Sequence, residues 1–149
     1  MTLNKEDVRS GLMPDEPAYE KLARRFGKKA LVFLEELAGS PDSLLAGKAV
    51  SLAGFIGGAE AVRTLRRGAA HEDTGVRAAA AYSLQRFMLK DAGPLLEELL
   101  EDPDPPVLKF AIRSAAKFPE SAAIRKKLTS LKKSSKEHVR HEAEKALSG

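Results

Sequence analysis

The stretch HEDTGVRAAAAYSLQRF, residues 71–87, and the stretch EDPDPPVLKFAIRSAAKF, residues 101–118, share one layout. Each begins with acidic residues in a polar turn, continues with a valine and apolar residues at helical spacing, and ends on a phenylalanine. A short carboxylate ahead of a helix can accept hydrogen bonds from the free N–H groups of its first turn, so we expect Asp73 and Asp104 to be helix caps. The pattern predicts a turn followed by an amphipathic helix in each stretch.

This layout recurs along the chain with a period of about 31 residues. The apolar residues that open the second helix of each unit are Leu45, Val76, Val107 and Val139, at spacings of 31, 31 and 32. The motifs SLAGF, SLQRF and SAAKF begin at Ser51, Ser83 and Ser114, at spacings of 32 and 31. One residue therefore slips within the first unit, where Asp42 holds the capping position. A fixed period of this length is typical of stacked two-helix repeats and predicts four units.

The periodicity predicts one all-α domain over residues 1–149. Helices are expected near residues 17–38, 44–56, 59–69, 76–88, 91–101, 106–117, 121–132 and 137–147, after a short helix near 4–10. Gly27 is the point at which the first long helix can divide. The expected repeat units are 17–57, 58–88, 89–118 and 119–149, preceded by an N-terminal cap at 1–16.

Composition narrows the class of protein further. The chain is 43% hydrophobic, which is enough for a core, and its helix-forming residues outnumber β-branched ones. It has no cysteine, which excludes disulfides and cysteine-ligated metals and suits a reducing compartment. No apolar run approaches 18 residues, and no apolar segment follows Met1. We therefore expect no membrane span, no secretory signal and a cytoplasmic location.

The net charge of +4 is unevenly distributed along the sequence. Residues 1–60 carry 8 basic and 9 acidic side chains, residues 61–120 carry 9 of each, and residues 121–149 carry 8 basic and 3 acidic. The basic excess therefore belongs to the last repeat, and the chain as a whole is not a generally basic protein.

The turn and second helix of the two quoted stretches resemble HEAT repeats of the short bacterial kind, over about residues 30–149. The Val-Arg pair of that family is present as Val76-Arg77 and as Arg140 after Val139, but the third unit has Leu108 in place of the arginine. In the first unit that position is Leu45 or Ala46, so an Asp–Arg ladder along all the turns is not expected. The resemblance implies a right-handed α-solenoid whose second helices line its concave side, with the short N-terminal helix as a cap.

This register predicts which side chains face the concave groove. Three expected columns are Val50, Tyr82, Arg113 and Lys145; Ala46, Ala78, Lys109 and His141; and Gly54, Arg86 and Lys117. The columns change from small and apolar residues in the first unit to basic residues in the last. Tyr82 and Ile112 are the expected apolar anchors, and Tyr82 is the stronger candidate because aromatic residues are favoured at the centres of interfaces. The predicted partner-binding residues are Val50, Tyr82, Arg86, Lys109, Ile112, Arg113, Lys117, His141 and Lys145.

Two further basic features have competing interpretations. One is the face formed by Lys21, Arg24, Arg25, Lys28 and Lys29, which is either an anion-binding amphipathic helix or the solvated face of a solenoid helix. The other is the cluster Arg125, Lys126, Lys127, Lys132, Lys133 and Lys136, which either attracts nucleic acid or keeps an exposed repeat end soluble. For the first feature, the solvated face of a solenoid helix is the favoured interpretation. For the second feature, both interpretations stay open.

The residues that would carry catalysis or bind a cofactor are missing. The segment HEAEK places Lys145 where a zinc-hydrolase motif needs a second histidine after His141, so no metal site is expected. The glycines of GFIGG are not followed by the Lys-Ser or Lys-Thr of a phosphate loop. We therefore expect neither catalytic residues nor a cofactor.

The sequence favours a non-enzymatic adaptor that binds another protein, with an acidic segment, in its concave groove. Two alternatives stay open. One is a HEAT-like protein that binds nucleic acid or another acidic polymer, in which case the basic last unit provides the attraction. The other is a protein similar to the HEAT-like bilin lyases, which rests on analogy of fold alone.

Overall fold

The computed structural model describes residues 2–149, and within them every regular element is helical. The helices are α1 (Lys5–Gly11), α2 (Tyr19–Phe26), α3 (Leu31–Ala38), α4 (Ser43–Ile56), α5 (Val62–Ala69), α6 (Thr74–Ser83), α7 (Leu89–Leu99), α8 (Pro105–Ala115), α9 (Ala122–Leu131) and α10 (Glu137–Ser148). Short 3-10 segments cover Gly27–Ala30, Ala59–Ala61 and Leu84–Arg86. Gly27 has a positive φ of 59° and divides the first expected long helix into α2 and α3, as predicted.

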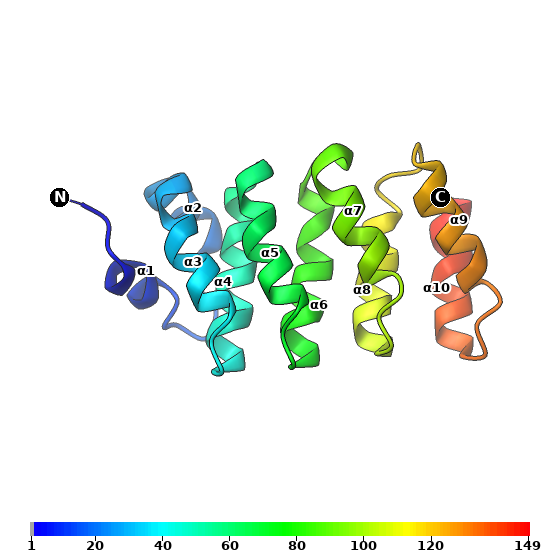
Figure 1. Cartoon of the computed structure of the whole chain (residues 1–149), viewed down its shortest axis with the longest axis horizontal. Coiled ribbons are helices and arrows are strands. Elements are labelled where there is room, and N and C mark those ends of the chain that lie inside the picture. The colour runs from blue at the N-terminus through cyan, green and yellow to red at the C-terminus, as the bar shows by residue number, and fades with distance from the viewer. Residues whose placement is uncertain (1) are drawn as a thin grey trace.

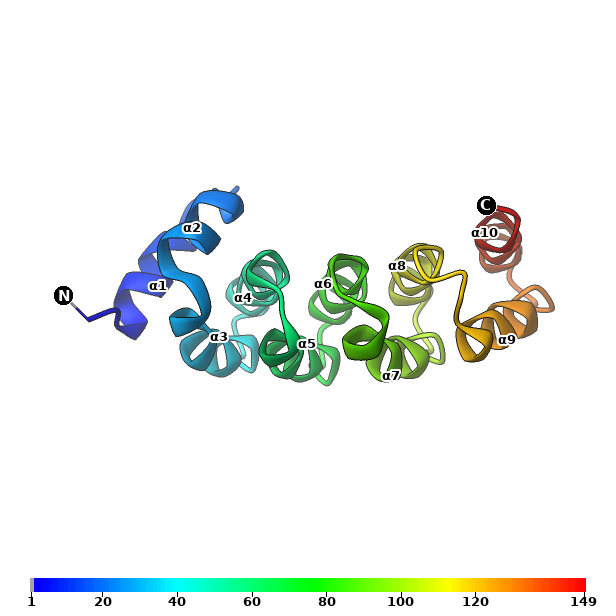
Figure 2. The same cartoon turned by 90° about the horizontal axis from the view of Figure 1, so that it is seen from above.

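The helices form two parallel rows (Figures 1 and 2). Helices α3, α5, α7 and α9 make one row, and α4, α6, α8 and α10 make the other. Helix α2 packs beside α4, and α1 lies at the N-terminal end. Both ends of the molecule turn toward the side of α4, which makes the second row the concave side (Figure 2). The prediction of an all-α solenoid of four two-helix units with a short N-terminal helix is confirmed.

The turns between the two rows are held by the predicted aspartates, with one exception. Asp42 accepts a hydrogen bond from the N–H of Leu45 at 3.2 Å, and Asp73 accepts one from the N–H of Val76 at the same distance. Asp104 begins α8 but caps none of its N–H groups, so that prediction is wrong. The reason is that its carboxylate accepts hydrogen bonds from Arg77 and from the hydroxyl of Thr74, while the two prolines that follow it offer no N–H.

The carboxylate of Asp104 instead belongs to a cluster around Arg77, which joins the second and third units. Arg77 donates to Asp104, to Asp102 at 3.0 Å, and to the backbone carbonyls of His71 and Glu72 at 3.1 and 2.9 Å. Hydrogen bonding to Asp102 is the largest cause that raises the pKa of Arg77. The guanidinium therefore stays charged and fixes two successive turns relative to each other.

The concave row is closely packed because small residues lie where its helices meet. Ser114 on α8 is fully buried and donates its hydroxyl to the carbonyl of Ala81 on α6 at 2.5 Å. Gly54 on α4 lies against Ser83 on α6, where a Cβ on residue 54 would come within 2.9 Å of the serine side chain. Ser83 and Ser114 are thus contact points between neighbouring units.

None of the helices in residues 2–149 is both long enough and apolar enough to cross a lipid bilayer.

Candidate partner-binding groove

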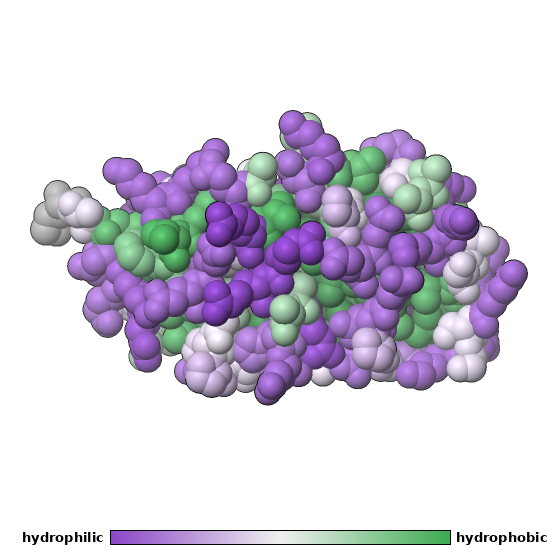
Figure 3. All heavy atoms as spheres, viewed as in Figure 1, coloured by the Kyte–Doolittle hydropathy of each residue, from purple (hydrophilic) through white to green (hydrophobic). Residues whose placement is uncertain are grey.

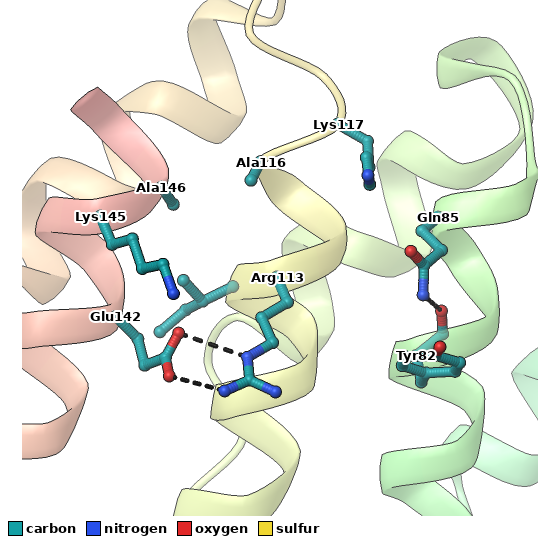
Figure 4. A pocket seen from close by; sticks show the side chains of 9 residues that line it. Tyr82, Gln85, Arg113, Ala116, Lys117, Glu142, Lys145 and Ala146 are labelled. Carbon is teal, nitrogen blue, oxygen red and sulfur yellow. Dashed lines mark hydrogen bonds and ion pairs between the residues drawn. The ribbon is translucent and has the colours of Figure 1, made fainter. Parts of the chain in front are cut away.

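The concave side carries a pocket of about 370 Å³ between α6, α8 and α10 (Figure 4). Its lining combines apolar side chains with cationic ones and a single carboxylate. The lining residues are Tyr82, Gln85, Ile112, Arg113, Ala116, Lys117, Glu142, Lys145 and Ala146. Five of them are residues predicted to bind a partner, namely Tyr82, Ile112, Arg113, Lys117 and Lys145.

The other predicted groove residues lie outside this pocket. Lys109 and His141 are exposed on α8 and α10, and Arg86 is exposed at the end of the 3-10 turn that follows α6. All the predicted basic residues are therefore open to solvent on elements of the concave row, but Arg86, Lys109 and His141 do not line the pocket.

The placement of Val50 in the groove is wrong. Asp42 and Asp73 cap their helices at equivalent positions, so α4 follows α6 in a 31-residue register. In that register Ser51 corresponds to Tyr82, while Val50 corresponds to the buried Ala81. Val50 is fully buried and packs on α5, where Gly68 leaves room for it.

Ile112 belongs to the same column as Val50 and Ala81, and its role as an exposed anchor is also wrong. Its side chain is 1% exposed, because it packs into the core between the two rows. Ile112 therefore contributes to the floor of the pocket, and Tyr82, at 46% exposed, is the accessible apolar side chain.

Two phenylalanines on the concave side were missed by the sequence reasoning. The ring of Phe110 meets the ring of Tyr82 edge-on at 5.6 Å, and the guanidinium of Arg113 lies 5.9 Å from its centre. Such contacts hold an exposed aromatic side chain in one orientation. The signal was present in the 31-residue register, which places Phe110 on the concave side at the position of the partly buried Ala79.

The second phenylalanine, Phe55, closes the N-terminal end of the concave side. The ring of Tyr19 on α2 stacks on the ring of Phe55, with 5.5 Å between the two ring centres. The guanidinium carbon of Arg86 lies 3.8 Å from the centre of the Phe55 ring. Burial raises the pKa of Tyr19, against a smaller opposing effect of its hydrogen bond with Ser51. Arg86 is thus engaged with Phe55, while the pocket lies farther along the concave side, between α6, α8 and α10.

The pocket contains an ion pair between two helices. Arg113 on α8 donates from Nη2 and Nε to the carboxylate of Glu142 on α10, at 3.0 and 3.4 Å (Figure 4). These hydrogen bonds are the largest cause that lowers the pKa of Glu142, and the charges of Lys145 and Lys109 lower it further. Glu142 is therefore ionised at neutral pH.

Several ion pairs between units lie on the convex side, whereas three lysines of the concave side form none within residues 2–149. On the convex row, ion pairs join successive units through Lys5–Glu36, Arg63–Glu35, Arg66–Glu98 and Lys127–Glu101. The face that carries this row is largely hydrophilic (Figure 3). On the concave row, Lys109, Lys117 and Lys145 form no ion pair with any residue in 2–149. The groove is therefore a site of net positive charge.

The described part of the chain has no cluster of side chains suited to binding a metal ion. No three histidine, aspartate or glutamate side chains within residues 2–149 are arranged to hold a metal ion.

Comparison with known proteins extends these observations. The sequence pattern of the family described as HEAT repeats matches residues 30–115. No curated protein matches the chain. A chain in the complex of CpcE and CpcF of phycocyanin lyase from Nostoc sp. PCC7120 is similar over 95% of this chain and 96% of that one, with a TM-score of 0.77 and 16% identity.

Two designed or engineered structures are also similar. A designed armadillo repeat protein in complex with the peptide (KR)4 matches over 99% of this chain and 77% of that one, with a TM-score of 0.62 and 18% identity. An engineered protein matches over 97% and 78%, with a TM-score of 0.58 and 24% identity. Likeness at this level of identity shows the fold alone.

Proposed function

The chain belongs to the HEAT-repeat family, and on this premise we propose that it is a non-enzymatic adaptor that holds another protein in the concave groove of α6, α8 and α10. The partner is expected to present an acidic segment. The observation that carries the proposal is the pocket itself, where Lys117 and Lys145, which form no ion pair within residues 2–149, lie on the same lining as the exposed ring of Tyr82.

The pocket gives this proposal a physical basis. Complementary charge accelerates association and selects partners, whereas a buried apolar contact supplies much of the affinity. The groove combines both elements, because Tyr82 is exposed beside Lys117 and Lys145. Such a combination suits an acidic protein segment that also carries apolar side chains.

The test compares two charge-reversed variants in affinity capture from a cell extract. The groove variant is K109E/K117E/K145E, and the matched control is R125E/K132E/K133E, whose residues are exposed on the last unit outside the pocket. Each variant lowers the formal net charge by six, from +4 to −2. We expect the control to recover the same partner as the wild-type chain and the groove variant to lose it. Equal recovery by all three proteins would place the interaction elsewhere.

Nucleic acid is separated from a protein partner by a salt titration with duplex DNA. Binding through phosphates weakens steeply as salt rises. We expect no measurable binding of DNA by the wild-type chain at low salt. Strong, salt-dependent binding that the groove variant loses would assign the groove to nucleic acid instead.

A second candidate function comes from the likeness to the phycocyanin lyase complex, which covers nearly the full length of both chains. In this case the groove would accept an open-chain tetrapyrrole, and Lys117 and Lys145 would bind its carboxylates. The test is the absorbance spectrum of free bilin mixed with the protein. A spectrum that shifts with the wild-type chain and not with the groove variant would favour this candidate, and an unchanged spectrum would remove it.

A further inference from the structure

Three cationic side chains surround one carboxylate inside the proposed groove. Glu142 accepts both hydrogen bonds that Arg113 donates across from α8, and its side chain is 15% exposed. The charges of Lys145 and Lys109 act on the same carboxylate and help to lower its pKa. Cations from two neighbouring units thus act on a point where the chain places its own acidic group.

The same pocket has an apolar part beside this carboxylate. Ile112, Ala116 and Ala146 line this apolar part of the pocket. Tyr82 lines it as well, and 46% of the tyrosine is exposed. A volume of about 370 Å³ is within the range of pockets that hold small molecules, so it has room for an apolar side chain. A ligand that fills the pocket therefore needs an apolar group next to an acidic one.

Building on the proposed function, we propose that Glu142 occupies the position that a carboxylate of the partner takes in the complex. The partner segment is a peptide in which an aromatic or large aliphatic side chain is adjacent to aspartate or glutamate. Its apolar side chain enters the pocket beside Tyr82, and its carboxylate replaces Glu142 on Arg113. Glu142 is therefore a specificity residue, which an acidic segment displaces and a neutral one does not.

The energetics of this exchange follow from the charges present. Exchanging one carboxylate for another on Arg113 conserves the charge-assisted hydrogen bonds, so the net change is small. Lys117 and Lys145 then attract the remaining acidic groups of the partner, while the displaced Glu142 repels them. Removing the charge of Glu142 abolishes both the competition and the repulsion, so it strengthens the binding of an acidic segment.

The test uses fluorescence anisotropy with the full chain and three labelled peptides of nine residues. The first has a central phenylalanine flanked by glutamates, the second has serine in place of the phenylalanine, and the third has glutamine in place of the glutamates. We expect the wild-type chain to bind the first peptide about tenfold more tightly than either of the others. We expect Glu142→Gln to tighten the binding of the first peptide about fivefold and to leave the third unchanged.

A matched variant and a second measurement separate this role from a structural one. Glu98→Gln removes an equivalent inter-unit ion pair, with Arg66 on the convex row, and is expected to leave peptide affinity unchanged. In thermal unfolding, sodium glutamate is expected to stabilise Glu142→Gln more than the wild-type chain, relative to sodium chloride at equal ionic strength. The outcomes distinguish the two proposals. Equal or weaker binding of the first peptide by Glu142→Gln overturns the role of Glu142, whereas no binding of any peptide by either protein counts against the groove itself.

Discussion

At the scale of single residues, the close packing of neighbouring helices in the concave row depends on small residues at their contacts. Gly54 and Gly47 are both in α4, but only Gly54 faces a neighbouring helix closely, at Ser83. A methyl group at residue 47 would have no atom beyond its own helix turn within 4 Å. The same chemical change therefore has opposite expected effects at the two positions.

We predict that Gly54→Ala lowers the free energy of unfolding by about 1–3 kcal/mol, because the methyl group overpacks the contact with Ser83. Gly47→Ala is expected to raise it by about 0.5–1 kcal/mol, because alanine loses less backbone entropy in a helix. Urea unfolding of the two variants measures both. If Gly54→Ala were as stable as Gly47→Ala, the close approach of α4 and α6 would be wrong.

Glu142 gives the chain a pH dependence whose sign is fixed by its ion pair. The pKa of Glu142 in the folded chain lies below its ordinary value of 4.5, chiefly through the hydrogen bonds from Arg113. Its stabilising contribution is therefore complete above pH 4.5 and is lost as the pH falls through the lower, folded value. We predict that Glu142→Gln lowers the free energy of unfolding at about pH 6 and that this difference shrinks steadily on acidification below 4.5. A difference that grows on acidification would contradict the lowered pKa.

At the scale of elements, the contact between the turns of the second and third units depends on a largely buried ion pair. The side chains of Arg77 and Asp102 are 15% and 9% exposed, and they are 3.0 Å apart. Most of the helices, by contrast, have caps or ion pairs that water reaches. The Arg77 cluster is thus the polar contact most protected from solvent among the ion pairs of residues 2–149.

We predict that Asp102→Asn lowers the free energy of unfolding by about 2–3 kcal/mol, because it leaves the Arg77 charge incompletely paired. Glu98→Gln, which breaks an exposed pair with Arg66, should cost less than about 1 kcal/mol. Chemical denaturation of both variants provides the comparison. Equal losses would mean that burial does not distinguish the two pairs.

The period and the turn chemistry were sufficient to predict most elements, because both are local properties of the sequence. The caps at Asp42 and Asp73 followed from residue type, and the division at Gly27 followed from the glycine. The one-residue slip was the weak point, since the motif at Ser51 suggested a 32-residue offset that moved Val50 into the groove. The equivalent caps at Asp42 and Asp73 favour the 31-residue register, and the burial of Val50 against Gly68 of α5 agrees with it.

The contents of the groove were harder to predict than its location. Arg113, Lys117 and Lys145 were expected to face the concave groove, and they line the pocket on that side. The ion pair of Arg113 with Glu142 joins residues 29 positions apart, and such pairing depends on how two units stack. The same holds for Phe110 against Tyr82. Which side chains meet across the interface between two repeats depends on how one repeat is rotated and shifted against the next. The repeat period in the sequence does not specify that geometry.

At the scale of the whole molecule, stability should decline toward the C-terminal unit. The buried residues of α9 and α10 are Ile124, Leu128, Val139 and Ala143, whereas α8 alone buries six residues. Because a repeat protein is stabilised by contacts between neighbours, a unit that buries few residues opens most easily. We predict that amides of α9 and α10 exchange with deuterium faster than those of α6 and α8. Equal protection throughout would indicate a single cooperative unit.

The central claim is that the concave surface of α6, α8 and α10 binds an acidic protein segment. Hydrogen–deuterium exchange of the chain, with and without its captured partner, tests it most directly because every helix is observed at once. The account predicts that the partner slows exchange in α6, α8 and α10 and leaves α3, α5 and α7 unchanged. Slower exchange confined to α3, α5, α7 and α9 would contradict it, because the partner would then bind the convex row.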